Sequence, residues 1–312
     1  MFNIAPFRDW IALPRVQAFI QEEYPDDDIP DLDTLMRNTA LQITHSTLFT
    51  GDGLRPVHPQ TILAGLMTCA PAPSLSGDLA TWVEEAEHGV ILVSFGSVIT
   101  ASKMPEEKRV MMLEVFSKLK QRVIWKWEEE MTGLPDNVRV SAWLPQTSLL
   151  AHPNVRLFIT HGGMGSIQET LCHKTPIVGV PVHGDQHPLV SGAVTQGWAV
   201  SIDWKTVTGA GLEAAIREVL DNPGYKEAVV RLSDLVMDQP LHPLERTVWW
   251  MEYLLRHPHN KEMRSPVHNL NWFQYFLLDV IGTILLILSI IFYISYKLCT
   301  ACCCRSKKLK HE

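Results

Sequence analysis

The sequence predicts an α/β fold: a doubly wound parallel sheet, followed by one C-terminal transmembrane helix. Three observations lead to this prediction. From Gly89 onwards, short apolar runs alternate with helical stretches, which is the pattern of a parallel sheet covered by helices. Several of the runs end in glycine or polar residues, and ligands of such sheets bind beyond the carboxyl ends of the strands. Finally, an uncharged apolar segment covers Val280 to Tyr296.

The strands and helices of this sheet can be placed along the chain. Strand-like runs cover Val90–Phe95, Arg122–Trp127, Val138–Trp143, Leu157–Thr160, Pro176–Pro181 and Trp198–Ile202. Helical stretches cover Pro105–Leu119, Ser166–Cys172, His187–Gln196, Gly211–Leu220, Tyr225–Val236 and Leu244–Arg256. Because short buried runs and helices alternate in this order, the strands are expected to be parallel.

The chain divides into five parts by composition. Residues 1–86 are rich in proline and aspartate, contain two strand-like runs (Ala40–Thr44 and Thr61–Met67), and look like the end of an earlier domain. The expected parts are this segment, the sheet domain 87–258, a juxtamembrane segment 259–275, a transmembrane helix 276–296 and a tail 297–312. The composition, 46% hydrophobic and 20% charged, is that of a globular protein. The net charge of −7 gives no reason to expect a nucleic-acid partner.

The apolar segment near the C-terminus has the features of a membrane span. It is long enough to cross the hydrocarbon core as a helix, with Trp272, Phe273 and Tyr275 before it and Tyr293 and Tyr296 near its end as interfacial aromatic residues. The alternative is a buried core helix. The tail carries five basic residues and one acidic residue, which is typical of a cytosolic flank. The first twenty residues are interrupted by charges and lack the apolar core of a secretory signal, so we expect that a signal-bearing start is missing.

The six cysteines do not predict a disulfide framework. Only Cys69 and Cys172 lie in the globular part, and nothing in the sequence requires them to pair. The other four, Cys299, Cys302, Cys303 and Cys304, follow the apolar segment, where palmitoylation is a reasonable hypothesis.

The strongest candidate site is the glycine-rich turn His161-Gly162-Gly163-Met164-Gly165-Ser166, which follows one strand and opens a helix. Glycines allow close approach of a ligand, and the helix N-terminus attracts an anion, so a phosphate site is expected. Close packing of helix against strand is the alternative reason for the glycines. The turn matches neither the dinucleotide-binding nor the P-loop pattern, which argues against a nicotinamide enzyme or a P-loop ATPase. Ser97, after the first strand, offers a further hydroxyl.

Other chemically suited residues stand at neighbouring strand ends: Trp143, Gln146, Glu169, Asp185 and Gln186. A flat aromatic ring, an acid and a carboxylate–amide pair suit a nucleobase, a ribose diol and a sugar. His183 and His187 flank the Asp–Gln pair, but Gly184 interrupts the helix that a metal site with this spacing would need, so we expect no metal.

These residues resemble the signature of the UDP-glycosyltransferase family, in its animal membrane-bound branch that includes the UDP-glucuronosyltransferases. The resemblance runs from about Pro30 to Lys308 and is carried by the pattern WLPQ…HGG…E…DQ from Trp143 to Gln186. Further matching stretches are SFGS at 94–97, QRVIWKWE at 121–128, DQPLHPLERTVWWMEYLLRH at 238–257 and WFQYFLLDVIG at 272–282. The resemblance implies the Rossmann-like C-terminal domain of the GT-B architecture, which binds the UDP-sugar donor.

The resemblance also implies roles for these residues. Trp143 would stack on uracil, Gln146 would bond to the uracil or ribose, and Glu169 would accept the ribose hydroxyls. His161, Gly163 and Ser166, assisted by Ser97, would bind the diphosphate, and Asp185 and Gln186 would hold the sugar. Gly165 and Leu189 depart from the family pattern, which often has asparagine at both positions. The co-substrate would be UDP-glucose or UDP-glucuronate, and neither a metal nor another cofactor is implied.

The family's catalytic base is a histidine of the N-terminal domain, which also forms the acceptor pocket; neither His45 nor His58 stands in a matching context. No catalytic residue is therefore assigned in this chain. Two hypotheses follow. The chain is a fragment of an enzyme that transfers a hexosyl or glucuronosyl group, with inversion, to a lipophilic small molecule; or it is a non-catalytic UDP-sugar-binding or dimerising membrane module that regulates full-length partners. Loss of a general base typically costs roughly 10²–10⁴-fold in rate.

The C-terminal residues suggest a location. Lys308 and Lys310 stand fifth and third from the end, which resembles the dilysine signal for retrieval to the endoplasmic reticulum. A basic tail alone is equally consistent with simple membrane topology. Together with the family resemblance, the tail predicts a single-pass protein of the endoplasmic reticulum membrane, with a lumenal donor domain and a cytosolic tail.

Overall fold

The computed structural model describes residues 11–46, 57–97, 99–258 and 262–308, without the side chains of Arg37, His268 and residues 301–308. It divides into two compact units. One is Ile43–His257, and the other combines Met1–Gln42 with Pro258–Glu312. The first unit contains the sheet domain and the candidate site.

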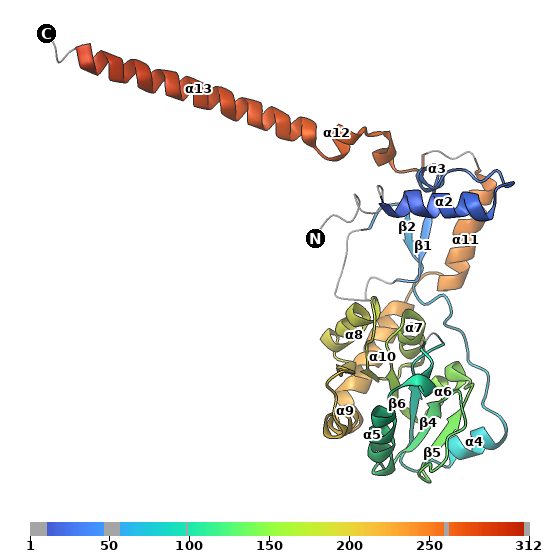
Figure 1. Ribbon diagram of the computed structural model, residues 1–312. Helices are drawn as coiled ribbons and strands as arrows, with labels where there is room; N and C mark the ends of the chain where they lie inside the picture. Colours follow the sequence, from blue (N-terminus) through green and yellow to red (C-terminus); the bar gives the residue numbers. More distant parts are fainter. Residues whose placement is uncertain (1–10, 47–56, 98, 259–261, 309–312) are drawn as a thin grey trace. The chain divides into compact units, whose positions relative to one another are not determined.

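The core of the first unit is a sheet of six parallel strands (Figure 1). These are β3 (Val90–Ser94), β4 (Arg122–Lys126), β5 (Val138–Ser141), β6 (Val155–Thr160), β7 (Ile177–Gly179) and β8 (Ala199–Ser201). Each predicted strand is present, with ends that differ by a few residues. The strand order is β5-β4-β3-β6-β7-β8, so the direction of winding reverses between β3 and β6. This order is that of the Rossmann fold, and the reversal creates a crevice at the carboxyl ends of β3 and β6.

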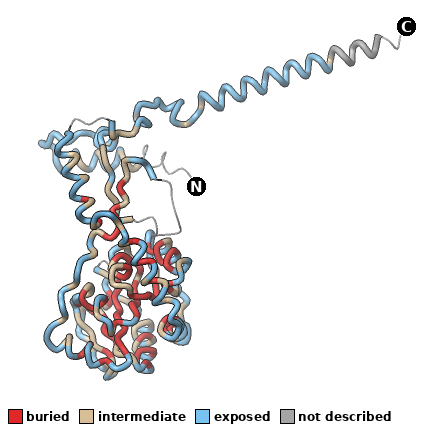
Figure 2. Tube along the Cα trace, turned by 180° about the vertical axis from the view of Figure 1, so that it is seen from behind, coloured by how far each residue is buried: buried red, intermediate tan, exposed pale blue. Residues whose placement is uncertain are grey.

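Helices cover both faces of the sheet, which explains why its strands are apolar runs rather than alternating patterns. Alternate residues of β3 enter different cores: Val90 and Leu92 belong to one, Ile91 and Val93 to the other. The first core is completed by α4 (Gly77–Glu84), α6 (Gln146–Ala151), α7 (Met164–His173), α8 (Gln186–Thr195) and α10 (Pro223–Met237). The second is completed by α5 (Glu106–Ser117) and α9 (Gly209–Asp221). The buried residues of the molecule gather in this domain (Figure 2).

The composition predicted that the sheet domain begins at residue 87, but the compact unit that contains the sheet begins upstream, at Ile43. Trp82 and Val83 of α4 and Leu66 are buried in the same core as β3, so this stretch packs as part of the sheet domain. The two early strand-like runs form a small two-stranded sheet, β1 (Gln42–Thr44) and β2 (Thr61–Leu63). Two helices that the sequence did not predict precede it, α2 (Leu13–Glu23) and α3 (Leu32–Arg37).

Cys69 and Cys172 form a disulfide, a pairing that the sequence left open. Cys172 lies on α7 and Cys69 follows β2, and both pack against the core that contains β3. The two residues are 103 positions apart in the chain, and only the folded sheet domain brings their Cα atoms to 5.4 Å. This distance is typical of a disulfide. The bond fastens the segment before α4 to the glycine-led helix.

The C-terminal part contains one helix that is long and apolar enough to cross a membrane. After α11 (Pro243–Arg256), η3 (Pro266–Asn269) and α12 (Trp272–Tyr275), the chain turns at Leu277, which has a φ of 56°, and continues as α13 (Leu278–Lys308). The apolar stretch is Leu278–Thr300, with a mean hydropathy of 2.3 and no buried residues (Figure 2). It begins two residues after the predicted start, because Leu277 interrupts the helix. Lys310 lies outside the described residues, as do the side chains of Cys302, Cys303, Cys304 and Lys308.

Candidate functional site

A pocket of about 740 Å³ lies at the carboxyl edge of the sheet, where the winding reverses. Its walls come from the turns after β3 and β6 and from the connection between β5 and α6. Seven of the nine predicted donor-site residues line it: Ser97, Trp143, Gln146, His161, Gly163, Ser166 and Glu169. Predicted residues that follow three separate strands therefore converge, as expected for the carboxyl ends of parallel strands.

The N-terminus of α7 faces this pocket. Gly163 is the N-cap residue, and Met164, Gly165 and Ser166 form the first turn of this ten-residue helix. Since glycine has no side chain, the N-cap offers no oxygen to the N–H groups of that turn. These N–H groups and the positive end of the helix dipole favour an anion, such as a phosphate.

The imidazole of His161 lies between two glycine backbones. A Cβ at Gly96 would come within 2.7 Å of the ring and a Cβ at Gly163 within 2.6 Å, so neither position accommodates a side chain without moving the histidine. Gly96 also has a φ of 83°, which favours glycine. Burial lowers the pKa of His161 below its ordinary value, although the charge of Asp185 acts in the opposite direction. The ring is therefore neutral at pH 7 and can donate one hydrogen bond and accept another.

Glu169 projects from α7 into the pocket and is held by two residues of α6. The amide of Gln146 and the hydroxyl of Thr147 both donate hydrogen bonds to its carboxylate, the latter over 2.7 Å. Beside them, the side chain of Trp143 is largely exposed, with 76% of its surface accessible. The exposed indole offers the flat apolar surface on which a nucleobase stacks, and the oriented carboxylate beside it can accept hydrogen bonds from a ribose diol.

Asp185 and Gln186 do not line the pocket. Gln186 is buried at the start of α8, and its side-chain oxygen accepts hydrogen bonds from the N–H groups of Val182 and His183. This amide oxygen therefore shapes the turn after β7. Asp185 is exposed, and it lies near enough to His161 to act on its pKa. The two residues stand beside the pocket rather than in its wall.

Among the pocket residues that were not assigned from the sequence are Lys126, Thr147 and Thr68. Lys126 ends β4, and its ammonium donates to the carbonyl of Gly96 over 2.8 Å and to the carboxylate of Glu128 over 3.1 Å. It adds positive charge beside the glycine turn after β3. Its position at a strand end was a usable signal. Thr68 has no local signal, because the adjacent disulfide from Cys69 to α7 determines its place.

The described part of the chain shows no group of three or more histidine, cysteine, aspartate or glutamate side chains placed to hold a metal. The pocket instead combines helix amides, a lysine, an exposed indole and an oriented carboxylate. These groups fit a nucleoside diphosphate: the amides and the lysine match its phosphates, the indole its base and the carboxylate its ribose.

Comparisons with known sequences agree with this chemistry. The family described as "UDP-glucoronosyl and UDP-glucosyl transferase" matches residues 31–311. UDP-glucuronosyltransferase 2B1 of Rattus norvegicus is 38% identical over 250 residues, which cover 80% of this chain and 47% of the relative. A UDP-glucuronosyltransferase of Pleuronectes platessa is 38% identical over 90% of this chain and 61% of its own length. The 2-hydroxyacylsphingosine 1-beta-galactosyltransferase of Rattus norvegicus is 38% identical over 78% and 45%. The chain thus spans about half the length of these relatives.

Solved structures show the same fold. The glycosyltransferase of kitacinnamycin has a TM-score of 0.60 and 25% identity, and the match covers 80% of this chain and 65% of that one. The calicheamicin glycosyltransferase CalG4 has a TM-score of 0.54 at 20% identity, with coverage of 80% and 60%. The predicted fold class is confirmed: the sheet domain is that of GT-B glycosyltransferases, accompanied by one apolar C-terminal helix. On the strength of the family match and these relatives, the chain belongs to the UDP-glucuronosyl and UDP-glucosyl transferase family.

Proposed function

We propose that the pocket at the reversal of the sheet binds a UDP-sugar, and that the protein is a UDP-glycosyltransferase. The observation that supports this most is the convergence of Trp143, Glu169 and the α7 N-terminus in one pocket. Each group alone has a structural explanation, but together they match a base, a ribose and a diphosphate in the order in which UDP presents them.

In the proposed complex, uracil stacks on Trp143, and Glu169 accepts hydrogen bonds from the ribose hydroxyls. Gln146 holds Glu169 in place and borders the same site. The diphosphate lies at the amides of α7, next to His161, Ser166 and Ser97, as the seven pocket residues suggest. The sugar then extends towards Asp185 and Gln186 beside the pocket.

The proposed reaction transfers a hexosyl or glucuronosyl group to a hydroxyl of a lipophilic small molecule, with inversion at the anomeric carbon. The C–O bond to the diphosphate breaks, and the amides of α7 together with Lys126 stabilise the negative charge that develops on departing UDP. This stabilisation requires no metal or other cofactor. The general base that removes the acceptor's proton is expected from the half of the relatives that this chain does not match, as the resemblance implies.

We further propose that the protein spans the endoplasmic reticulum membrane once, with the donor domain in the lumen and the basic tail in the cytosol. The disulfide between Cys69 and Cys172 supports this orientation, because such bonds persist in the oxidising lumen and are rare in the cytosol. In intact microsomes, protease added outside should remove a tag at Glu312 and leave residues 43–257 uncut. Digestion of the donor domain in sealed vesicles would contradict the orientation.

Thermal unfolding of the full chain in nanodiscs tests donor binding. UDP, UDP-glucose and UDP-glucuronate are each added, with ADP-glucose as the control for the base. A ligand at 100 times its dissociation constant adds about 2.7 kcal/mol to the stability of the folded state. We expect the uridine compounds to raise the melting temperature and ADP-glucose to have little effect. Equal shifts with uridine and adenine compounds would reject the assigned base site.

A further inference from the structure

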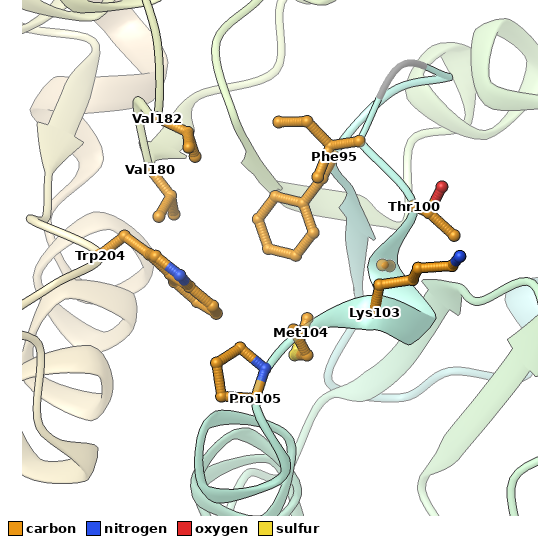
Figure 3. A pocket seen from close by; sticks show the side chains of 10 residues that line it. Phe95, Thr100, Lys103, Met104, Pro105, Val180, Val182 and Trp204 are labelled. Atoms are coloured by element: carbon orange, nitrogen blue, oxygen red, sulfur yellow. The ribbon is translucent and has the colours of Figure 1, made fainter.

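A second cavity, of about 300 Å³, lies at the same edge of the sheet, and none of the residues that line it was assigned to the donor. Figure 3 shows the side chains that surround it: Phe95, Met104 and Pro105 on one side, and Val180, Val182 and Trp204 on the other. The first three come from the turn after β3 and the segment that leads to α5. The others follow β7 and β8. We call this cavity the apolar pocket.

The apolar pocket shares its supporting elements with the pocket of about 740 Å³ that we propose binds the donor, called the donor pocket below. Phe95 faces the apolar pocket, and the next residue, Gly96, lines the donor pocket. The Val182 N–H donates to the side chain of Gln186 over 2.8 Å, so a wall of the apolar pocket is held by a residue assigned to the sugar. An acceptor held beside the sugar would therefore lie within reach of this cavity.

The segment between the two pockets is fixed at both ends. Lys126 donates to the carbonyl of Gly96, and Glu128 accepts a hydrogen bond from the N–H of Ser102 over 3.0 Å. Lys126 and Glu128 also form an ion pair with each other over 3.1 Å. This chain of contacts links the donor pocket to the short helix η2 (Ala101–Lys103), which forms part of the apolar pocket. The cavity is therefore built into the domain.

The lining selects a hydrocarbon or aromatic group. Phe95 is buried, and its ring lies 6.0 Å from that of Trp204 at an angle of 60°. The polar side chains, Thr100 and Lys103, belong to exposed residues. Against the apolar side chains, a sugar or a phosphate would lose hydrogen bonds to water and gain none in return. An apolar ring or chain would gain contact with the two aromatic side chains and the flexible Met104.

We propose that this apolar pocket binds the hydrophobic end of the acceptor molecule whose hydroxyl receives the sugar. The inference rests on the proposed function, and it assigns part of acceptor recognition to the donor domain itself. Two observations indicate the occupant. The pocket adjoins the residues assigned to the transferred sugar, and its lining matches a lipophilic molecule rather than a second nucleotide or sugar.

Fluorine NMR of the full chain in nanodiscs, labelled with 5-fluorotryptophan, tests this proposal. The chain has ten tryptophans, and Trp204→Phe and Trp143→Phe identify the two resonances of interest. The probe is 1-naphthol, a lipophilic phenol. We expect 1-naphthol to shift the Trp204 resonance saturably, and UDP to shift that of Trp143. The fluorine spectrum thus reports on the two pockets separately.

A matched pair of variants locates the effect. Val182→Phe places a ring at the apolar pocket, and Val194→Phe places one on α8 outside it; the two valines are similarly exposed, at 38% and 41%. We expect the naphthol response of Trp204 to be lost in Val182→Phe and kept in Val194→Phe, while UDP still shifts Trp143 in both.

Three outcomes would overturn the proposal. One is that 1-naphthol does not shift the Trp204 resonance although UDP shifts that of Trp143; donor binding would then still stand. Another is that Val182→Phe and Val194→Phe change the naphthol-induced shift of the Trp204 resonance by the same amount. The third is a Trp204 shift caused by lengthening the lipid acyl chains without naphthol, which would identify a lipid as the occupant. Failure of Trp143 to respond to UDP would instead contradict the proposed function.

Discussion

Removal of the disulfide between Cys69 and Cys172 should destabilise the sheet domain strongly. The bond closes a loop of 103 residues. Loop-closure entropy for a cross-link of this length corresponds to about 4.7 kcal/mol at 25 °C, and loss of a native disulfide typically costs about 2–5 kcal/mol. We expect the double variant Cys69→Ser/Cys172→Ser to lose stability within that range. With a urea dependence of about 2–3 kcal/mol per M, the unfolding midpoint falls by about 1–2 M.

The assay is urea unfolding of the full chain in nanodiscs, followed by tryptophan fluorescence. Reduced wild-type protein should unfold like the double variant. Cys299→Ser is the control, because Cys299 is a free, exposed cysteine on α13 and outside the donor domain. Its midpoint should equal that of the wild type.

The bond should also matter for ligand binding. Thr68 lines the donor pocket next to Cys69, and Glu169 lies one helical turn before Cys172. We therefore expect weaker UDP binding in the double variant, even under conditions where it is fully folded. The reasoning is refuted if the double variant unfolds at the wild-type midpoint with an unchanged slope, or if Cys69 is alkylated in wild-type protein unfolded without reductant.

Three further predictions concern the donor pocket. Gly163→Ala should destabilise the domain by about 1–3 kcal/mol, because the added Cβ would meet the ring of His161. Gly165→Ala should be neutral or stabilising by up to about 1 kcal/mol, because a Cβ there has nothing within 4 Å. The melting temperatures of the two variants test this difference. UDP-glucose should bind more tightly as the pH falls, because burial holds the pKa of His161 low in the free protein and a bound diphosphate raises it, so that binding takes up a proton. Calorimetry in two buffers measures the uptake, which should vanish in His161→Gln. Without ligand the sign is opposite: the lowered pKa of His161 makes the folded state lose stability as the pH falls through about 6.5, where the unfolded chain binds the proton first. Lys126→Met should weaken UDP binding by roughly 10- to 150-fold, since a hydrogen bond to a charged group contributes about 1.5–3 kcal/mol. The variant should also reduce the salt dependence of the affinity. Unchanged affinity and salt dependence would exclude Lys126 from the diphosphate site.

The sheet was predictable because its strands are buried on both faces. All five residues of β3 are buried, so the strand is a continuous apolar run, which is visible in the sequence. Residues that line the pocket could be selected from the sequence for a related reason. The carboxyl ends of parallel strands meet at one edge of the sheet, so polar residues that follow different strands, such as Trp143 and His161, become neighbours.

The features that the sequence did not predict depend on contacts between distant segments. The partner of Cys69 is 103 residues away and carries no local signal. α4 is short, and its burial against the sheet appears only once Trp82 and Val83 are packed. Lys126 stands at the end of β4, which is visible in the sequence, but its hydrogen bond to the carbonyl of Gly96 on the neighbouring strand end appears only in the fold.

The most direct test of donor binding is calorimetric titration of the full chain with UDP, comparing the wild type with Trp143→Ala and Trp249→Ala. Both tryptophans are exposed, but Trp249 lies on α11 outside the pocket. Stacking of a base on an aromatic ring contributes about 1–3 kcal/mol, so Trp143→Ala should raise the dissociation constant roughly 5- to 150-fold. Trp249→Ala should bind UDP like the wild type. Absence of binding heat in the wild type, or equal affinity in all three proteins, would contradict a uridine site at the reversal of the sheet.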